Sequence, residues 1–266
     1  MPEKQVRKVH ANGMDFYTEL RGSGHPLVLI PAGANDCEYL SRIGDILAKD
    51  FLVVTFDTRG GSRSMPPEDI RVTPKVLAGD AVGIMSALGL KTASIYGCSS
   101  GGQAALAIGK YFPEAAHNII VHEAALAMDG PFPTSCFDFF NAIFSTYGPV
   151  CSGFSPRDVV FICDKAKWDA LGEDFLDRVS KNEAYWAKWY KGAVDVAQYT
   201  GKEIKAMPNL EFTVGAWSPT WMTYANIKVA ESGGVPWRWF NCGHCPEVVL
   251  PEEYADYISN TCKKHI

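Results

Sequence analysis

The amino-acid sequence predicts an α/β fold with a mostly parallel central sheet flanked by helices and a helical insertion. Three observations lead to this prediction. Short runs rich in Val, Ile, Phe and Thr alternate with amphipathic stretches, as in sheets whose strands are joined by crossover helices. A Gly-Cys-Ser-Ser-Gly turn, residues 97–101, joins one of these runs to a helix-forming segment. One long segment after residue 128 interrupts the alternation.

The alternation places the individual elements in order. Seven strands are expected, at Met14–Arg21, Leu27–Ile30, Phe51–Phe56, Ser94–Tyr96, Asn118–His122, Glu211–Val214 and Trp237–Phe240. Helices are expected between several of them, around Tyr39–Ala48, Pro74–Leu88, Ser99–Tyr111 and Pro251–Lys264.

The interrupting segment has aromatic and charged residues at helical spacing, as in FDFFNAIFSTY, DKAKWDALGEDFLDRV and NEAYWAKWYKG. Prolines lie on both sides of it, Pro131 and Pro133 before and Pro208 after. We therefore expect a helical cap, or lid, at residues 129–206 and a core formed by residues 1–128 and 207–266.

Composition excludes several classes of partner. The chain has 266 residues, 47% of them hydrophobic, and a formal charge of −5 without a block of like charge, so nucleic acid is an improbable partner. No run approaches the roughly 20 apolar residues that span a bilayer, which predicts a soluble cytoplasmic protein without a membrane partner. The eight scattered cysteines suggest buried free thiols in a reducing compartment, because Cys242 and Cys245 have no second pair at metal-ligand spacing. An oligomer is possible and not determined by the sequence.

The Gly-x-Ser-x-Gly turn predicts a nucleophile at Ser99. Gly97 and Gly101 leave room for a turn too tight for side chains on either side of the serine. The amide of Ser100, at the start of the following helix, would face a developing oxyanion. The alternative is that these small residues only cap a helix.

A serine nucleophile requires a base, and His244 is the best placed of six histidines. It follows the last expected strand in a glycine-containing loop and precedes the terminal helix. The remaining histidines are expected to have solvated, capping or core roles; they are His10, His25, His117, His122 and His265.

The acid that orients the histidine is expected in an unusual place. In this architecture it commonly follows the strand that here is Glu211–Val214, but the loop AWSPTW contains no Asp or Glu. Glu123 instead follows the apolar run that ends at His122, near the same sheet edge. If that strand continued, His122 and Glu123 would face opposite sides and only one would reach the site. Asp129 is the fallback, and a solvated charge at a strand end is the structural alternative.

Two further loops follow expected strands. The loop IPAGANDCEY would provide a second oxyanion amide from Gly33, because a backbone approaching a substrate favours a residue without Cβ, although an ordinary turn glycine explains it equally well. In TFDTRGGSRS, Asp57 and Arg59 are expected to form a local ion pair or turn cap.

These motifs together resemble the fungal zearalenone lactonases, a branch of the α/β hydrolases. The matching pieces are YGCSSG, VHE, TVGAWSPT, KNEAYWAKWY and the His244 loop, and the likeness covers essentially the whole chain. The resemblance implies a triad of Ser99, Glu123 and His244, oxyanion amides of Gly33 and Ser100, a pocket residue at Trp186, and no metal or cofactor. It implies cleavage of a hydrophobic resorcylic acid lactone, a mycotoxin, through an acyl-enzyme.

The chain departs from the family pattern at Ala32, where the family has an aspartate, in the stretch that begins at Lys191, and at Cys245, where an aromatic residue is typical. These positions would lie near the substrate, so they bear on substrate choice. Alternatives with the same fold are a carboxylesterase, a carbon–carbon bond hydrolase, and a weakly active small-molecule receptor.

Overall fold

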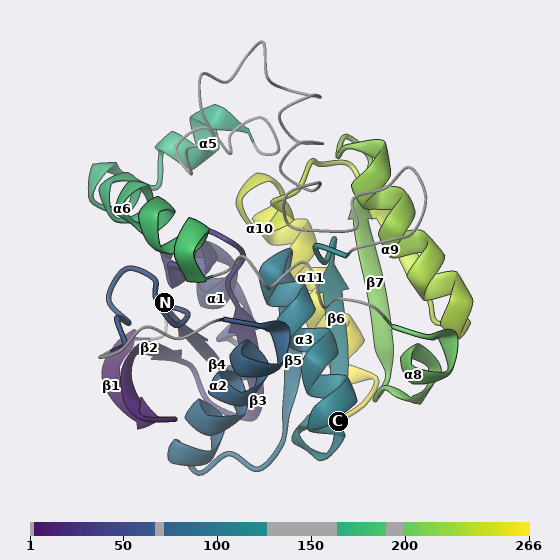
Figure 1. Ribbon diagram of the computed structural model, residues 1–266, viewed down its shortest axis with the longest axis horizontal. Helices are drawn as coiled ribbons and strands as arrows, with labels where there is room; N and C mark the ends of the chain where they lie inside the picture. The colour runs from purple at the N-terminus through teal and green to yellow at the C-terminus, as the bar shows by residue number, and fades with distance from the viewer. Residues whose placement is uncertain (1–2, 67–71, 127–163, 190–198) are drawn as a thin grey trace.

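A computed structural model of the protein describes residues 3–66, 72–126, 164–189 and 199–266, without the side chains of 183–189. Its centre is one eight-stranded sheet with the order β1-β2-β4-β3-β5-β6-β7-β8 (Figure 1). The strands are β1 Gln5–Ala11, β2 Met14–Arg21, β3 His25–Ile30, β4 Phe51–Phe56, β5 Ala93–Cys98, β6 Ala116–His122, β7 Leu210–Gly215 and β8 Trp237–Phe240.

The sheet is mostly parallel, which fixes where its loops meet. β1 pairs antiparallel with β2 and β2 with β4, whereas all pairs from β4 to β8 are parallel. The carboxyl ends of β5, β6 and β7 therefore lie side by side at one edge. In α/β sheets this edge is where ligands bind.

Helices cover both faces of the sheet (Figure 1). The two 3₁₀ helices are η1 Cys37–Leu40 and η2 Pro113–Ala115. The α-helices are α1 Ser41–Leu47, α2 Pro74–Ala87, α3 Ser100–Tyr111, α5 Lys165–Asp169, α6 Glu173–Trp189, α8 Gly201–Ala206, α9 Thr220–Gly233, α10 Pro246–Val249 and α11 Pro251–Lys263. Among the described helices, none is long and apolar enough to cross a membrane.

Strand alternation divides the interior into two cores. In β3, Val28 and Ile30 pack with α2, α3 and α9, while Leu27 and Leu29 pack with α1 and α11 on the opposite face. Both faces of the parallel strands are thus buried, which accounts for their nearly continuous apolar runs.

The seven expected strands and four expected helices are confirmed. Besides the short helices η2 and α10, two longer elements were not predicted. Strand β1 is mostly exposed, and helix α9 has no clear apolar stripe. Asp57 and Arg59 have other ion-pair partners: Asp57 binds Arg63, with Nε and Oδ2 2.6 Å apart, and Arg59 binds Asp80, with Nη2 and Oδ1 2.6 Å apart. The expected alternative of a turn cap holds for Asp57, whose Oδ2 also accepts from the Arg63 amide over 3.0 Å.

Part of the segment predicted as a cap lies within the described residues. Trp168 in α5 and Phe175 and Val179 in α6 belong to the same apolar cluster as Tyr39 and Leu40. Helix α8 packs on α9 instead, and its Ile204 joins the other core. The division into core and cap stays a prediction, since residues 127–163 and 190–198 lie outside the described part.

Candidate active site

Ser99 lies at the corner between β5 and α3 in a conformation that few non-glycine residues adopt. Its φ is 55° and its ψ −118°. A Cβ on Gly97 would collide with the carbonyl of Gly101, and a Cβ on Gly101 with that of Ile30. The amide of Ser99 donates to the carbonyl of His122 over 2.9 Å, which holds this corner against the end of β6. Only glycines on both sides permit the strained turn that presents the serine at the sheet edge.

Glu123 is the first residue after β6, and it is completely buried. Its positive φ of 41° ends the strand and turns the side chain toward β7. There Oε1 accepts a hydrogen bond from the Gly215 amide and Oε2 accepts one from the Ser218 hydroxyl, both over 2.8 Å. The protein thus supplies polar partners for a charge that burial would otherwise disfavour.

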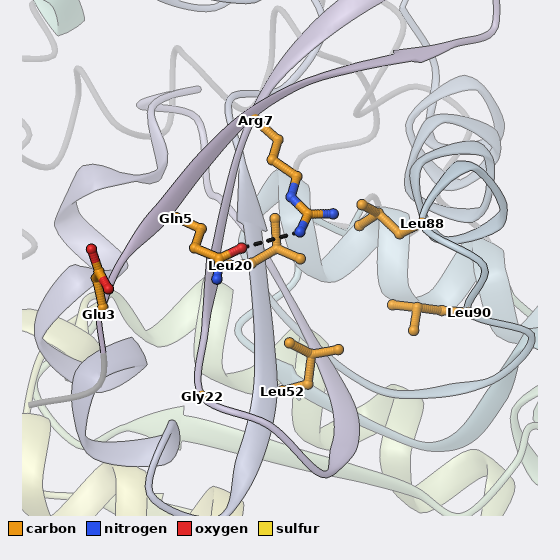
Figure 2. A pocket seen from close by; sticks show the side chains of 8 residues that line it. All are labelled: Glu3, Gln5, Arg7, Leu20, Gly22, Leu52, Leu88 and Leu90. Atoms are coloured by element: carbon orange, nitrogen blue, oxygen red, sulfur yellow. Dashed lines mark hydrogen bonds between the residues drawn. The ribbon is translucent and has the colours of Figure 1, made fainter.

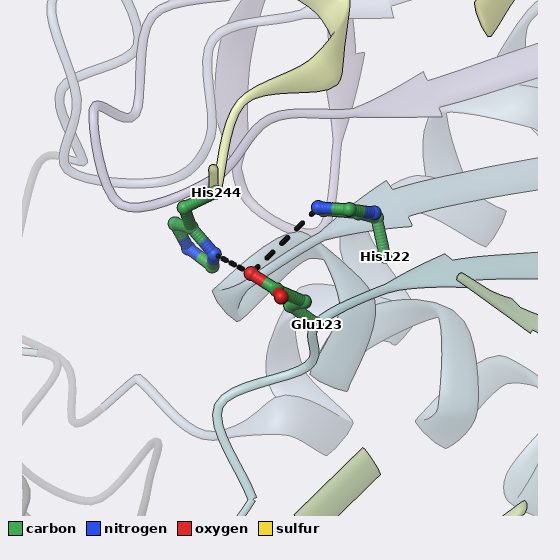
Figure 3. Close-up of side chains that lie close together, drawn as sticks. All are labelled: His122, Glu123 and His244. Carbon is green, nitrogen blue, oxygen red and sulfur yellow. Dashed lines mark hydrogen bonds and ion pairs between the residues drawn. The ribbon is translucent and has the colours of Figure 1, made fainter. Parts of the chain in front are cut away.

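His244, from the loop after β8, completes this group of contacts. Its Nδ1 lies 2.8 Å from Oε2 of Glu123, and the ring is 4% exposed (Figure 3). A carboxylate only accepts, so Nδ1 carries the proton and Nε2 is left free to act as a base. The backbone carbonyl of His244 accepts a bond from the Cys98 thiol over 3.3 Å, which ties the histidine to the residue before Ser99.

The electrostatics of Glu123 follow from these donors. Burial raises the pKa of its carboxyl, but the hydrogen bond from His244, the neighbouring imidazoles and the Gly215 amide outweigh burial, and the net pKa is lowered. The carboxylate is therefore charged at neutral pH, the state that fixes the histidine tautomer and stabilises an imidazolium.

His122 also reaches this group. Its Nε2 lies 3.7 Å from Oε2 of Glu123, and its Nδ1 lies 2.9 Å from the Thr213 hydroxyl (Figure 3). The condition under which only one of the adjacent residues would reach the site is not met, because the strand ends at His122 and alternation stops there. Burial lowers the pKa of His122 to about 4, so its ring is neutral.

Potential ligand atoms of His122, Glu123 and His244 lie within 4.8 Å of one another, a spacing that a metal ion could bridge. Both carboxylate oxygens already accept hydrogen bonds from the protein. The arrangement favours a carboxylate–imidazole pair over a metal centre.

The two residues predicted to supply oxyanion amides, Gly33 and Ser100, lie just beyond the carboxyl ends of β3 and β5. Ser100 is the first residue of α3, where the amide has no partner within the helix. Gly33 follows β3 in the turn Ala32–Asn35, which is closed by a 2.9 Å bond from the Asn35 amide to the Ala32 carbonyl. Both residues lie at the carboxyl edge of the sheet that carries Ser99, Gly33 in a turn and Ser100 at the start of α3.

The contribution of Gly215 and Ser218 was not predicted. The loop after β7 has no acid, yet Gly215 at the end of β7 and Ser218 in that loop each donate a hydrogen bond to Glu123, the acid that follows the neighbouring strand. A polar Ser-Pro step in an otherwise apolar loop is the sequence signal that could have indicated this role.

The remaining predicted positions are distributed as follows. Ala32 and Cys245 are buried, and Cys245 directly follows His244. Trp186 lies in α6, but its side chain is not described, and Asp129 and Lys191 lie outside the described residues. The cysteines within the described residues are buried thiols outside any disulfide, namely Cys37, Cys98, Cys242, Cys245 and Cys262.

A separate pocket of about 280 Å³ lies between β1, β2 and the end of α2 (Figure 2). Leu52, Leu88 and Leu90 form its apolar side, and Glu3, Gln5 and Arg7 are its polar residues. Leu52 is near the start of β4 and Leu90 precedes β5, so this pocket lies at the amino ends of the strands, away from Ser99 and His244.

A strained serine between a parallel strand and a helix, with a buried carboxylate–imidazole pair at the same sheet edge, is the arrangement of a hydrolase built on an α/β sheet. Residues 25–211 match the family model for the alpha/beta hydrolase fold. The chain belongs to the α/β hydrolase family, and it is a hydrolase.

Two relatives match nearly the whole chain. A zearalenone hydrolase from Cladophialophora bantiana is 33% identical over 96% of this chain and 95% of its own length. A zearalenone hydrolase from Bionectria ochroleuca is 31% identical over 96% of both chains. The resemblance to this group is therefore confirmed.

Solved structures show the same fold at lower identity. The enol-lactonase from Burkholderia xenovorans LB400 has a TM-score of 0.78 and 15% identity, covering 97% of this chain and 100% of that one. A thermophilic esterase from Thermogutta terrifontis has a TM-score of 0.77 and 17% identity, covering 98% and 100%.

Proposed function

We propose that the protein is a serine-dependent lactonase that opens the ester ring of a hydrophobic lactone, zearalenone or a related resorcylic acid macrolactone. The observation that carries this proposal is the similarity to two zearalenone hydrolases, which extends over 96% of the chain at 33% and 31% identity. The substrate named for those proteins is the first to test on this one.

The proposed nucleophile is Ser99 and the proposed base is His244. Nε2 of His244 takes the hydroxyl proton while Oγ of Ser99 attacks the ester carbonyl. Collapse of the tetrahedral intermediate breaks the ester bond, and the imidazolium gives the proton to the leaving alkoxide. In a lactone that alcohol stays attached to the acyl chain. Water, deprotonated by the same imidazole, then releases the carboxylic acid and restores Ser99.

Glu123 and two amides have supporting roles in this proposal. The 2.8 Å bond from Nδ1 of His244 to the buried Glu123 carboxylate supports a role in holding the tautomer and stabilising the imidazolium. The amides of Gly33 and Ser100 stabilise the negative oxygen of the tetrahedral intermediate. We propose Trp186 of the cap as a residue that lines the pocket, and the chemistry requires no metal or cofactor.

The test is to incubate the purified protein with zearalenone and to follow ring opening by mass spectrometry as the addition of one water. Expected results are hydrolysis by the natural sequence and loss of hydrolysis in folded Ser99→Ala and His244→Ala variants. A panel of unrelated esters and of carbon–carbon hydrolase substrates runs in parallel. If the protein hydrolyses compounds of this panel but no resorcylic lactone, the proposed substrate class is contradicted and the proposed serine chemistry is not.

A further inference from the structure

The turn that carries Gly33, residues Ala32–Asn35, is held from both sides. On the core side, the amide of Ala32 donates to the Tyr39 hydroxyl over 2.7 Å, and the carbonyl of Ala32 accepts from the amide of Asn35 over 2.9 Å. That carbonyl belongs to the same planar peptide as the amide of Gly33. Its hydrogen bond therefore sets the direction in which the Gly33 N–H points.

The other side of this turn is held by α6. Nδ2 of Asn182 donates to the carbonyl of Ala34 over 2.8 Å, and Oδ1 accepts from the amide of Ser62 over 2.7 Å. Asn182 is 2% exposed, so it binds two backbone groups with no competition from solvent. One amide side chain thus joins the Gly33 turn to the turn after β4.

A second contact lies one helical turn earlier in α6. Nε of Arg178 is 2.7 Å from Oδ2 of Asp36, and its Nη2 is 2.6 Å from Oε2 of Glu38. Asp36 also accepts from the Glu38 amide and so caps η1. Arg178 and Asn182, four residues apart, lie on one face of the helix and both bind the loop that follows β3.

From these contacts we propose that Asn182 is a positioning residue for the oxyanion site. The Ala34 carbonyl shares a planar peptide with the Asn35 amide, and that amide binds the Ala32 carbonyl, which shares a peptide with the Gly33 amide. By fixing the Ala34 carbonyl, Asn182 therefore holds the Gly33 amide in the orientation that stabilises the transition state. The contact between α6 and this turn thus controls the rate of turnover. This inference rests on the proposed function, because it assigns the Gly33 amide to the oxyanion.

The chemistry explains why such a residue matters for rate more than for binding. Oxyanion donors act on charge that develops only in the transition state, and a misplacement of about 1 Å can cost about 10²-fold in rate. A turn with Gly at its first central position has no Cβ to limit its backbone. Helix α6, through Asn182, supplies the restraint that the turn itself lacks.

The experiment compares Asn182→Ala and Asn182→Asp with Ser62→Ala. Asn182→Asp keeps the side-chain shape and the acceptor for the Ser62 amide, but it removes the Nδ2 group that donates to the Ala34 carbonyl and, over 2.9 Å, to the Ser62 hydroxyl. Ser62→Ala removes only the second of these bonds and leaves the donor to Ala34 in place. We expect both Asn182 variants to lower kcat by between about 10-fold and 10²-fold with KM little changed. Ser62→Ala should change kcat by less than about threefold.

A trifluoromethyl ketone analogue of the ester distinguishes positioning from a purely structural role. Its hemiketal oxygen on Ser99 requires the oxyanion amides, so its affinity should fall in parallel with kcat, while binding of the ring-opened product stays unchanged. Equal loss of analogue and product binding, or unchanged kcat in folded Asn182→Asp, would overturn the inference. If the natural sequence hydrolyses no ester of the panel, the proposed function fails instead.

Discussion

Two completely buried glutamates, one before and one after His244 in the sequence, have pKa values that are shifted in opposite directions. Glu123 lies at the end of β6 and Glu247 lies in the first turn of α10, each with 0% exposure. The pKa of Glu123 is lowered, whereas burial raises the pKa of Glu247 to about 6. Equal burial therefore does not give an equal state of charge.

The difference follows from the number of hydrogen-bond donors. Both oxygens of Glu123 accept bonds, from the Gly215 amide, the Ser218 hydroxyl and His244. Glu247 accepts a side-chain bond from the Tyr96 hydroxyl at Oε1, but its Oε2 has no hydrogen-bond partner within the described residues. A carboxylate with three donors is stabilised as an anion, and one with few donors favours the neutral acid.

The comparison separates a carboxylate suited to chemistry from a carboxyl suited to packing. A charged carboxylate both holds the His244 proton on Nδ1 and stabilises an imidazolium by its charge. Glu247 instead binds the Tyr96 hydroxyl, and the Tyr96 ring packs edge to face on Tyr254 with the ring centroids 5.7 Å apart. Three changes test this contrast.

The largest expected effect comes from Glu123→Gln. The amide cannot stabilise an imidazolium by charge, and it offers a donor where His244 needs an acceptor, so kcat should fall on the order of 10⁴-fold. Steady-state kinetics on the best ester measure the change, with circular dichroism to establish that the variant is folded. A fully active variant would mean that another acid orients His244.

The next effect comes from Glu247→Gln and concerns stability. The folded-state pKa of Glu247, about 6, lies above its ordinary 4.5, so the stability that it contributes is present below about pH 4.5 and is lost as pH rises through 6. This loss amounts to about 2 kcal/mol, from a pKa shift of about 1.5. The free energy of unfolding of Glu247→Gln, relative to that of the natural sequence, should therefore rise by about 2 kcal/mol from pH 4.5 to pH 8.

Urea unfolding at both pH values measures this gain. The matched control is Glu253→Gln, which changes an exposed acid in α11 and should leave the pH dependence as it is. If the Glu247 variant keeps the pH dependence of the natural sequence, Glu247 is charged in the folded protein and the contrast with Glu123 is wrong.

Sequence alone predicted the parts of the fold that have strong local signals. β2, β4 and β8 have the expected bounds because apolar runs mark them. β1 was missed because only Val9 and Ala11 of it are buried. The Asn12-Gly13 turn that follows, with φ of 47° and 77°, is a hairpin signal that could have indicated the strand.

For the site, sequence indicated which residues meet but not what surrounds them. Glu123 was predicted because it follows an apolar run and the usual acid position is empty. The burial of Glu247 could not be predicted, because it depends on Tyr96, which is 151 residues away in the chain. Its segment, PEVV, has no local feature that distinguishes a buried carboxyl from an exposed one at a helix start.

The smallest expected effect comes from Ser218→Ala, which makes Glu123 more like Glu247 by removing one donor. A hydrogen bond to a charged group contributes about 1.5–3 kcal/mol and one to a neutral group about 1 kcal/mol. The variant should therefore lose about 2 kcal/mol of unfolding free energy at pH 7. This loss should shrink by about 1 kcal/mol as pH falls through the folded-state pKa of Glu123, which lies below the ordinary 4.5.

The sign of that change follows from the lowered pKa of Glu123, since its stabilising contribution is present above pH 4.5 and is lost as pH falls through the folded-state pKa. Ser232→Ala, which removes a hydroxyl that donates to Val229 on exposed α9 surface, is the control and should show no pH-dependent difference. An equal loss for Ser218→Ala at pH 7 and at the acidic end of a pH series that passes below the folded-state pKa of Glu123 would show that the hydroxyl supports the loop after β7 and not the charge of Glu123. The stability loss of Ser218→Ala should shrink at low pH because Ser218 donates to Oε2 of Glu123, the same oxygen that accepts the hydrogen bond from His244. Negative charge on that oxygen strengthens both hydrogen bonds.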